Sequence, residues 1–153
     1  SSKIVEAPEI PSSVKEVRHI FEKCDKLTKG TTFEHLTSIT QYNNVYHDCD
    51  SLVDASNISF PAGASNLNHA FSRCDNLVNP PDLSKMTGNF VLAQMFFESP
   101  KLSGTLEINT KSFSMNNSDF DFSKYQGSLT ITGTCPDLEK YVGKFSKINV
   151  IPK

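Results

Sequence analysis

Four segments of this chain repeat one another at a constant spacing of 25 residues. They begin at residues 17, 42, 67 and 92 and read VRHIFEKCDKL, YNNVYHDCDSL, LNHAFSRCDNL and LAQMFFESPKL. Self-similarity at this length is typical of solenoids, in which each repeat buries its apolar face against its neighbours. The repeat therefore predicts a row of stacked coils.

Each segment places apolar residues at its first, fourth, fifth and eighth positions, as in Val17, Ile20, Phe21 and Cys24. These offsets put side chains on one face of an α-helix, so we expect a short amphipathic helix in each coil. Equivalent residues of successive coils would stack at about 4.8 Å. The predicted aromatic column consists of Phe21, Tyr46, Phe71 and Phe96.

A short strand is predicted after each helix. Residues 105–109, TLEIN, and 128–132, SLTIT, alternate apolar and polar residues in the manner of a strand. One apolar anchor recurs in each coil, and the anchors are Ile10, Phe33, Ile58, Leu83, Ile108, Ile131 and Val150. We therefore predict seven parallel strands in one sheet, linked by six crossovers.

Length and charge limit the classes of function. The 153 residues fit one domain, with regular repeats over about 4–110 and irregular capping coils over about 111–153. With 15 basic and 17 acidic residues, nothing favours nucleic acid or an anionic membrane surface as a partner. No apolar run is long enough to enter a membrane, and no signal peptide opens the chain.

The first residues resemble the middle of a repeat. Residues 4–11, IVEAPEIP, are similar to residues 77–84, LVNPPDLS. We therefore interpret the chain as a fragment of a longer protein.

The cysteines at the eighth position, Cys24, Cys49 and Cys74, are open to three interpretations. A disulfide between neighbouring coils is allowed by distance, although parallel side chains do not point at each other. A metal site needs ligands that converge on a point, whereas these lie on a line. The third interpretation, which we favour, is that cysteine acts as a small buried apolar residue. Cys135 lies outside the column and has no predicted role.

Two further columns bear on chemistry. Asp25, Asp50 and Asp75 would either share a calcium ion or bond the backbone of a turn, and we favour the turn. The four histidines lack any motif of a catalytic or metal site and are assigned to solvated surface; they are His19, His35, His47 and His69. We expect no enzyme activity, cofactor or metal.

The pattern of an aromatic pair, a cysteine, a leucine and a short strand resembles the leucine-rich repeats of BspA-like bacterial surface proteins. Residues 70–83, AFSRCDNLVNPPDL, carry this resemblance, and coverage is good from Ile4 to about Ile108. The resemblance implies an α/β fold, a right-handed leucine-rich-repeat solenoid of about six coils, each with a short helix and a short parallel strand. It also implies an extracellular or cell-surface location.

The outward face of the predicted sheet is the expected binding surface. If Leu106 and Ile108 point inward, the two-residue period of a strand turns Glu107 and Asn109 outward. The equivalent residues of all coils form a polar, mildly acidic strip, which consists of Thr32, Glu34, Asn57, Ser59, Asp82, Ser84, Glu107, Asn109, Thr130 and Thr132. Solenoids use such faces for recognition, but simple solvation explains the same residues.

Two functions are consistent with this surface. The first is a noncatalytic, monomeric adhesion module of a larger protein that binds a protein or glycan ligand, including ligands of a host, through the strip. The alternative is a structural spacer or assembly element of a surface fibre or phage tail protein. The strip has few aromatic residues, which favours protein over sugar as its ligand.

Overall fold

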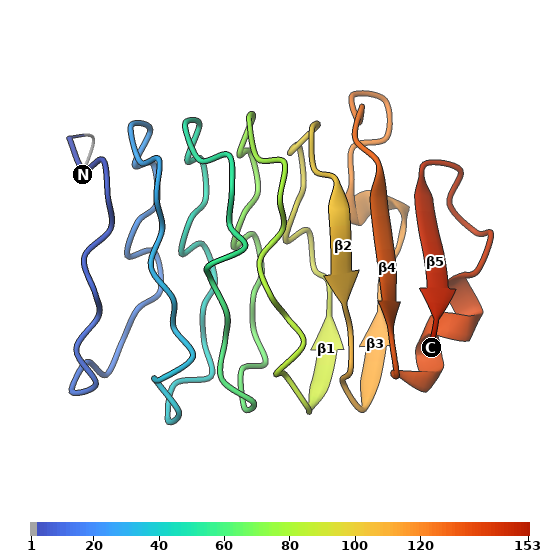
Figure 1. The fold of residues 1–153 in the computed structure, drawn as a ribbon, viewed down its shortest axis with the longest axis horizontal. Coiled ribbons are helices and arrows are strands. Elements are labelled where there is room, and N and C mark those ends of the chain that lie inside the picture. The colour runs from blue at the N-terminus through green and yellow to red at the C-terminus, as the bar shows by residue number, and fades with distance from the viewer. Residues whose placement is uncertain (1–2) are drawn as a thin grey trace.

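The computed structural model describes residues 3–153, which form a row of coils lying side by side along the long axis (Figure 1). The N-terminal and C-terminal coils lie at opposite ends of this row. The elements are β1 (Asn89–Val91), β2 (Gly104–Glu107), β3 (Ser112–Ser114), the 3-10 helix η1 (Asn117–Asp119), β4 (Leu129–Gly133), the 3-10 helix η2 (Pro136–Tyr141) and β5 (Ile148–Pro152).

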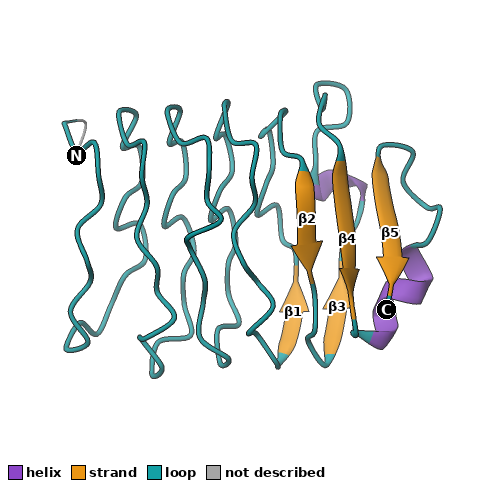
Figure 2. Cartoon of the chain, in the orientation of Figure 1, coloured by secondary structure: helices purple, strands orange, loops and turns teal. Residues whose placement is uncertain are grey.

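The strands form two small parallel sheets. In one, β1 pairs with β3, and in the other the order is β2, β4, β5. All of these elements lie from Asn89 onward, whereas the preceding coils are drawn entirely as loop (Figure 2). Those earlier coils are joined by isolated parallel bridges, such as Glu6 with Lys29 and Gln41 with Asn66.

The predicted fold class is wrong. No repeated helix-and-strand solenoid of the leucine-rich-repeat kind is present in residues 3–153, where the only helices are the 3-10 helices η1 and η2. The seven strands expected in one sheet are instead two sheets of two and three strands. The coils are built mainly from turns.

Left-handed backbone explains why no α-helix forms in the repeated segments. His19 and Lys23 have φ angles of 63° and 60°, whereas every residue of an α-helix needs a φ near −63°. The same two positions are left-handed in the next three coils; these residues are Asn44, Asp48, His69, Arg73, Gln94 and Glu98. Each segment is therefore interrupted twice, four residues apart.

The backbone hydrogen bonds alternate between the local turn and the next coil. The Ile20 N–H donates to the Val17 carbonyl at 3.1 Å, which closes a turn. The next N–H, that of Phe21, donates to the Val45 carbonyl of the following coil at 3.0 Å. Since buried N–H groups need partners, this alternation satisfies the backbone without helix or sheet.

The aromatic column predicted from the sequence is confirmed. The ring centroids of Phe21 and Tyr46 lie 5.4 Å apart, those of Tyr46 and Phe71 5.3 Å, and those of Phe71 and Phe96 6.0 Å, all stacked. All four residues are buried. The core is therefore a set of columns along the long axis, and aromatic stacking adds to the area that it buries.

The cysteine column connects adjacent coils. Cys49 Sγ donates to the Phe21 carbonyl and Cys74 Sγ to the Tyr46 carbonyl, both at 3.2 Å. Ser99, which replaces cysteine in the fourth segment, donates to the Phe71 carbonyl at 2.7 Å. The position thus favours a small side chain with one hydrogen to donate.

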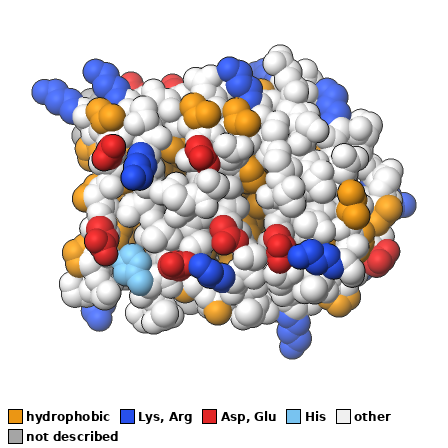
Figure 3. Space-filling model, viewed as in Figure 1, with side chains coloured by type: hydrophobic (Ala, Val, Ile, Leu, Met, Phe, Trp, Pro, Cys, Tyr) orange, Lys and Arg blue, Asp and Glu red, His pale blue; other side chains and the backbone are white. Residues whose placement is uncertain are grey.

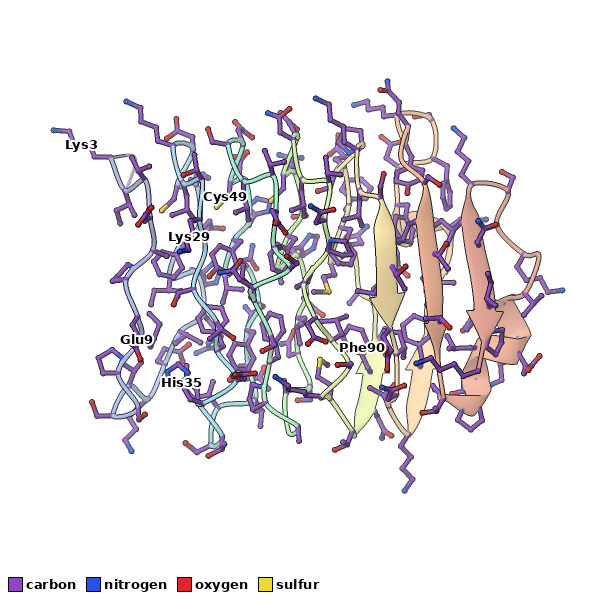
Figure 4. The ribbon with its side chains drawn as sticks, viewed as in Figure 1. Lys3, Glu9, Lys29, His35, Cys49 and Phe90 are labelled. Atoms are coloured by element: carbon purple, nitrogen blue, oxygen red, sulfur yellow. The ribbon has the colours of Figure 1, made fainter. Side chains whose placement is uncertain are left out.

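The thiols are free and lie in the core, as Figure 4 shows for Cys49. Burial raises the pKa of Cys74 to about 12 and also raises the pKa of Cys24 and Cys49, so the thiol form dominates at neutral pH. The interpretation as small buried residues is confirmed by this placement. Cys135, which has no place in the column, is buried as well.

The predicted strand anchors are buried, but two of them are out of register. Ser59 pairs with Asp82, 23 residues later, and the Phe33 ring contacts Phe60 with centroids 5.8 Å apart, so Ile58 is not the counterpart of Phe33. Ile131 pairs with Leu106 rather than with Ile108. Coils that contain a two-residue bulge displace the strict 25-residue count locally.

The C-terminal coils end the hydrogen-bond columns with side chains. Asp119 is buried, and its carboxyl oxygens accept from the N–H groups of Gln94 at 2.9 Å and Asn116 at 2.7 Å. The helix η2 carries Pro136 at its start and buries Leu138, as expected for a final cap.

Candidate functional site

The predicted strip lies on the side of the coils that carries β2, β4 and β5, which faces the reader in Figure 3. Leu106 and Ile108 are fully buried, as predicted, while Glu107 and Asn109 are half-buried. The structure brings the strip residues into three groups.

The first group joins the second and third coils. The Thr32 and Ser59 hydroxyls lie 3.1 Å apart, and the Ser59 hydroxyl donates to Glu34 at 2.6 Å. Glu34 also forms an ion pair with Lys85. Because Ser59 is buried, its hydroxyl holds Glu34 in place and offers little to a ligand.

The second group joins the fourth and fifth coils. Asp82 accepts from the Ser84 N–H at 2.9 Å and the Ser84 hydroxyl at 2.6 Å. The Asn109 amide donates to the Ser84 carbonyl at 3.2 Å and to Glu107 at 2.7 Å. Lys153 forms an ion pair with Glu107 at 3.4 Å.

The third group lies on β4. Thr130 is paired with Thr105, and Thr132 with Glu107, across the β2–β4 ladder. The Thr132 hydroxyl donates to the Ile151 carbonyl at 2.6 Å. Asn57 stands apart from all three groups, because its amide donates to the Gly30 carbonyl at 2.9 Å.

A groove of 360 Å³ crosses the middle of the strip. It is lined by Ser56, Pro80, Pro81, Asp82, Thr105 and Glu107. Asp82 bonds through one of its carboxyl oxygens to Ser84 and forms no ion pair with any residue from 3 to 153. This groove is the part of the strip where polar atoms remain available to a partner.

The strip is closer to charge balance than the sequence indicated. Lys85 and then Ser59 lower the pKa of Glu34, and Asn109 and then Lys153 lower the pKa of Glu107, so both carboxyls are ionised at neutral pH. On this face acidic and basic side chains lie next to one another (Figure 3). Both lysines were absent from the predicted strip because they come from other positions of the repeat.

Sequence reasoning also missed part of the groove. Pro80, Pro81 and Thr105 line it, and Ser56 joins them from the preceding coil. The paired prolines were a usable signal, because proline at a strand edge leaves no N–H to donate. Their position beside Asp82 is set by the turn geometry, which a strand-based interpretation does not provide.

The remaining candidate clusters carry no metal site. No group of three or more His, Cys, Asp or Glu residues is placed to hold a metal ion in the described part of the chain. In the aspartate column, Asp50 Oδ1 is buried and finds no partner among residues 3–153, so the predicted bond to the turn is not formed at this atom. Burial, followed by the charges of Asp75 and Asp48, raises the pKa of Asp50.

Comparison with family models, curated proteins and solved structures gives no match for this chain. The resemblance to BspA-like proteins therefore rests on the sequence pattern alone. The search for helices long and apolar enough to span a bilayer finds none in residues 3–153.

Proposed function

We propose that this chain is a noncatalytic adhesion module of an extracellular surface, which recognises a protein ligand through the outward face of its coils. The observation that carries the proposal is the groove across the strip, with Asp82 and Glu107 on its lining. Extended faces of coil stacks serve recognition because one rigid scaffold presents side chains from several coils at once. Few aromatic side chains line the groove, which favours a protein segment as the ligand.

Alanine substitution of strip residues tests this proposal. We expect the triple variant Asn57→Ala, Asp82→Ala, Glu107→Ala to keep its melting temperature and to lose at least tenfold in affinity for extracellular matrix proteins. Surface plasmon resonance against immobilised matrix proteins measures the loss. A matched variant, Asp25→Ala, changes an exposed carboxyl outside the strip and should bind as the wild type does. Equal binding by the triple variant and the wild type would reject the site.

One observation favours the alternative of an assembly element. Ile20 is 38% exposed, whereas its counterparts Val45, Ala70 and Met95 are fully buried by neighbouring coils. An apolar side chain at such a position is suited to packing against another molecule. Sedimentation at increasing protein concentration tests this role, which predicts association that Ile20→Asp abolishes. A monomer at all concentrations would exclude self-assembly through this surface.

A further inference from the structure

A hollow of 310 Å³ lies outside the strip, over the second, third and fourth repeated segments. Its lining consists of Asn44, His47, His69, Ser72, Arg73, Gln94 and Phe97. None of these residues belongs to the strip, so a ligand here would contact the protein independently of the proposed function.

One small residue opens the hollow. Ser72 occupies the same repeat position as Glu22, His47 and Phe97, all of which have larger side chains. It is buried, and its hydroxyl lies 2.5 Å from His47 Nδ1. Because the coils that carry His47 and Phe97 are two spacings apart, about 10 Å, room remains between those two side chains.

The amides on the lining show their acceptor atoms. The Asn44 amide nitrogen donates to Glu22 at 3.3 Å, and the Gln94 amide nitrogen donates to the Ser118 carbonyl at 3.1 Å. Since each nitrogen is engaged, the two carbonyl oxygens are left to accept hydrogen bonds. Neither oxygen has a hydrogen-bond partner within residues 3–153.

Donors lie beside these acceptors. Arg73 donates to Glu98 through Nε at 3.3 Å, which leaves its terminal amino groups for other partners. His47 and His69 are in edge contact, with ring centroids 6.3 Å apart, and His47 uses only Nδ1 on Ser72. The hollow thus combines hydrogen-bond donors and acceptors within one ring's width.

Charge within the hollow is nearly balanced. The Arg73 guanidinium is compensated by the Glu98 carboxylate. Burial lowers the pKa of His47, which keeps this imidazole neutral at physiological pH. Nothing in the lining therefore selects an anion or a cation.

Phe97 supplies a half-buried aromatic ring on one wall. A pyranose ring has an apolar face of C–H bonds, which packs on an aromatic face, and a rim of hydroxyls that both donate and accept. We propose that this hollow binds one neutral hexose unit of a glycan, stacked on Phe97 and hydrogen-bonded to Asn44, Gln94 and Arg73.

The test is a binding screen with defined sugars. A glycan array of neutral and acidic oligosaccharides is followed by NMR titration of the isotopically labelled protein with the neutral monosaccharides glucose, galactose, mannose and N-acetylglucosamine. We expect a dissociation constant on the order of 1 mM for a single ring, because one sugar buries little surface. Shifts should be confined to the residues of the hollow.

Two variants and one control locate the site. Phe97→Ala removes the stacking surface, and Ser72→Phe fills the hollow with a side chain that the same position already carries in the next coil. Each should weaken sugar binding at least tenfold, with melting curves and spectra confirming the fold. Glu107→Ala, on the strip, should leave sugar binding unchanged.

Each alternative result decides the matter. Absence of neutral sugar binding, binding of acidic sugars alone, or binding that survives Ser72→Phe would overturn the assignment. Sugar binding lost only in Glu107→Ala would place the sugar on the strip, which supports that surface and rejects the hollow. Protein binding lost in the strip variants, with no sugar bound at all, would leave the proposed function standing without this second site.

Discussion

Residues 3–88 and residues 89–153 stack in the same way but are held together differently. The first region contains most of the strict 25-residue repeat, yet its coils are joined by turn hydrogen bonds, side-chain columns and isolated bridges. The second region has a weaker repeat and holds every strand and 3-10 helix of the described residues. Regularity of sequence therefore reports the stacking of side chains, and regularity of backbone pairing is a separate property.

The largest expected effect comes from breaking the aromatic column of the first region. Phe71→Ala should cost about 3 to 5 kcal/mol, because Phe71 is fully buried between Tyr46 and Phe96 and leaves a cavity. Urea unfolding measures the loss. Phe122→Ala, at a partly buried ring of the second region, should cost less. Equal losses would show that the column has no special weight.

Backbone contact should dominate in the second region. Gly133 has a φ of 136°, and a Cβ there would lie 2.0 Å from the Ile108 carbonyl oxygen, so we expect Gly133→Ala to cost about 2 to 4 kcal/mol. Thermal unfolding provides the measurement. Gly63→Ala is the control in the first region, where an added Cβ meets nothing within 4 Å. A neutral Gly133→Ala would contradict the tight pairing of β4.

The thiol column offers an intermediate effect. Cys49→Ala removes the donor to the Phe21 carbonyl and leaves a small cavity, which should cost about 1 to 2 kcal/mol. Cys49→Ser should cost less, because Ser99 makes the equivalent bond in the fourth segment. Chemical denaturation of both variants separates these values, and a serine variant less stable than the alanine variant would argue against the hydrogen bond.

A glycine substitution distinguishes a left-handed turn from a helix. Lys23 is exposed with a φ of 60°, so Lys23→Gly should relieve strain and stabilise the protein by about 0.5 to 1 kcal/mol. In a helix the same change would destabilise by about 1 kcal/mol. Lys26→Gly, at an exposed position without a left-handed backbone, is the matched control and should be slightly destabilising. Melting temperatures measure both changes.

The smallest effect is a pH dependence. Burial lowers the pKa of His47 below its ordinary value of 6.5, so the unfolded chain binds the proton more readily than the folded protein. Stability should therefore fall as the pH drops from about 7 towards 5. His47→Asn should reduce this slope in thermal melts, whereas a slope unchanged by the substitution would assign it to other groups.

Burial could be predicted from the sequence, and backbone conformation could not. Val17, Phe21 and Cys24 are buried as predicted, because apolar spacing reports which side chains face the core. Offsets of three, four and seven residues fit an α-helix and also fit two successive turns separated by left-handed residues. Asn44 and Asp48 carried a signal of the second option, since Asn, Asp and His adopt positive φ more readily than other residues.

The candidate site shows the same limit. The outward direction of Glu107 and Asn109 followed from the period of a strand, whereas the lysines that neutralise the acidic residues come from positions that no period connects. The groove depends on the two prolines and on the register of Ser59 with Asp82, which is 23 residues and not 25. Register at a bulge is set by packing, so the repeat length alone could not predict it.

The alternating hydrogen bonds have an electrostatic consequence. His19 N–H donates to the Asn43 carbonyl, Asn44 N–H to Asn68 and His69 N–H to Ala93, so one peptide unit per coil is aligned in the same direction along the molecule. Such chains add their dipoles as an α-helix does, and the Asp119 carboxyl lies at the positive end of this one. A protein without α-helices in residues 3–153 thus has the polarity of a bundle of parallel helices. Two such molecules lying side by side would be attracted most strongly when their long axes point in opposite directions.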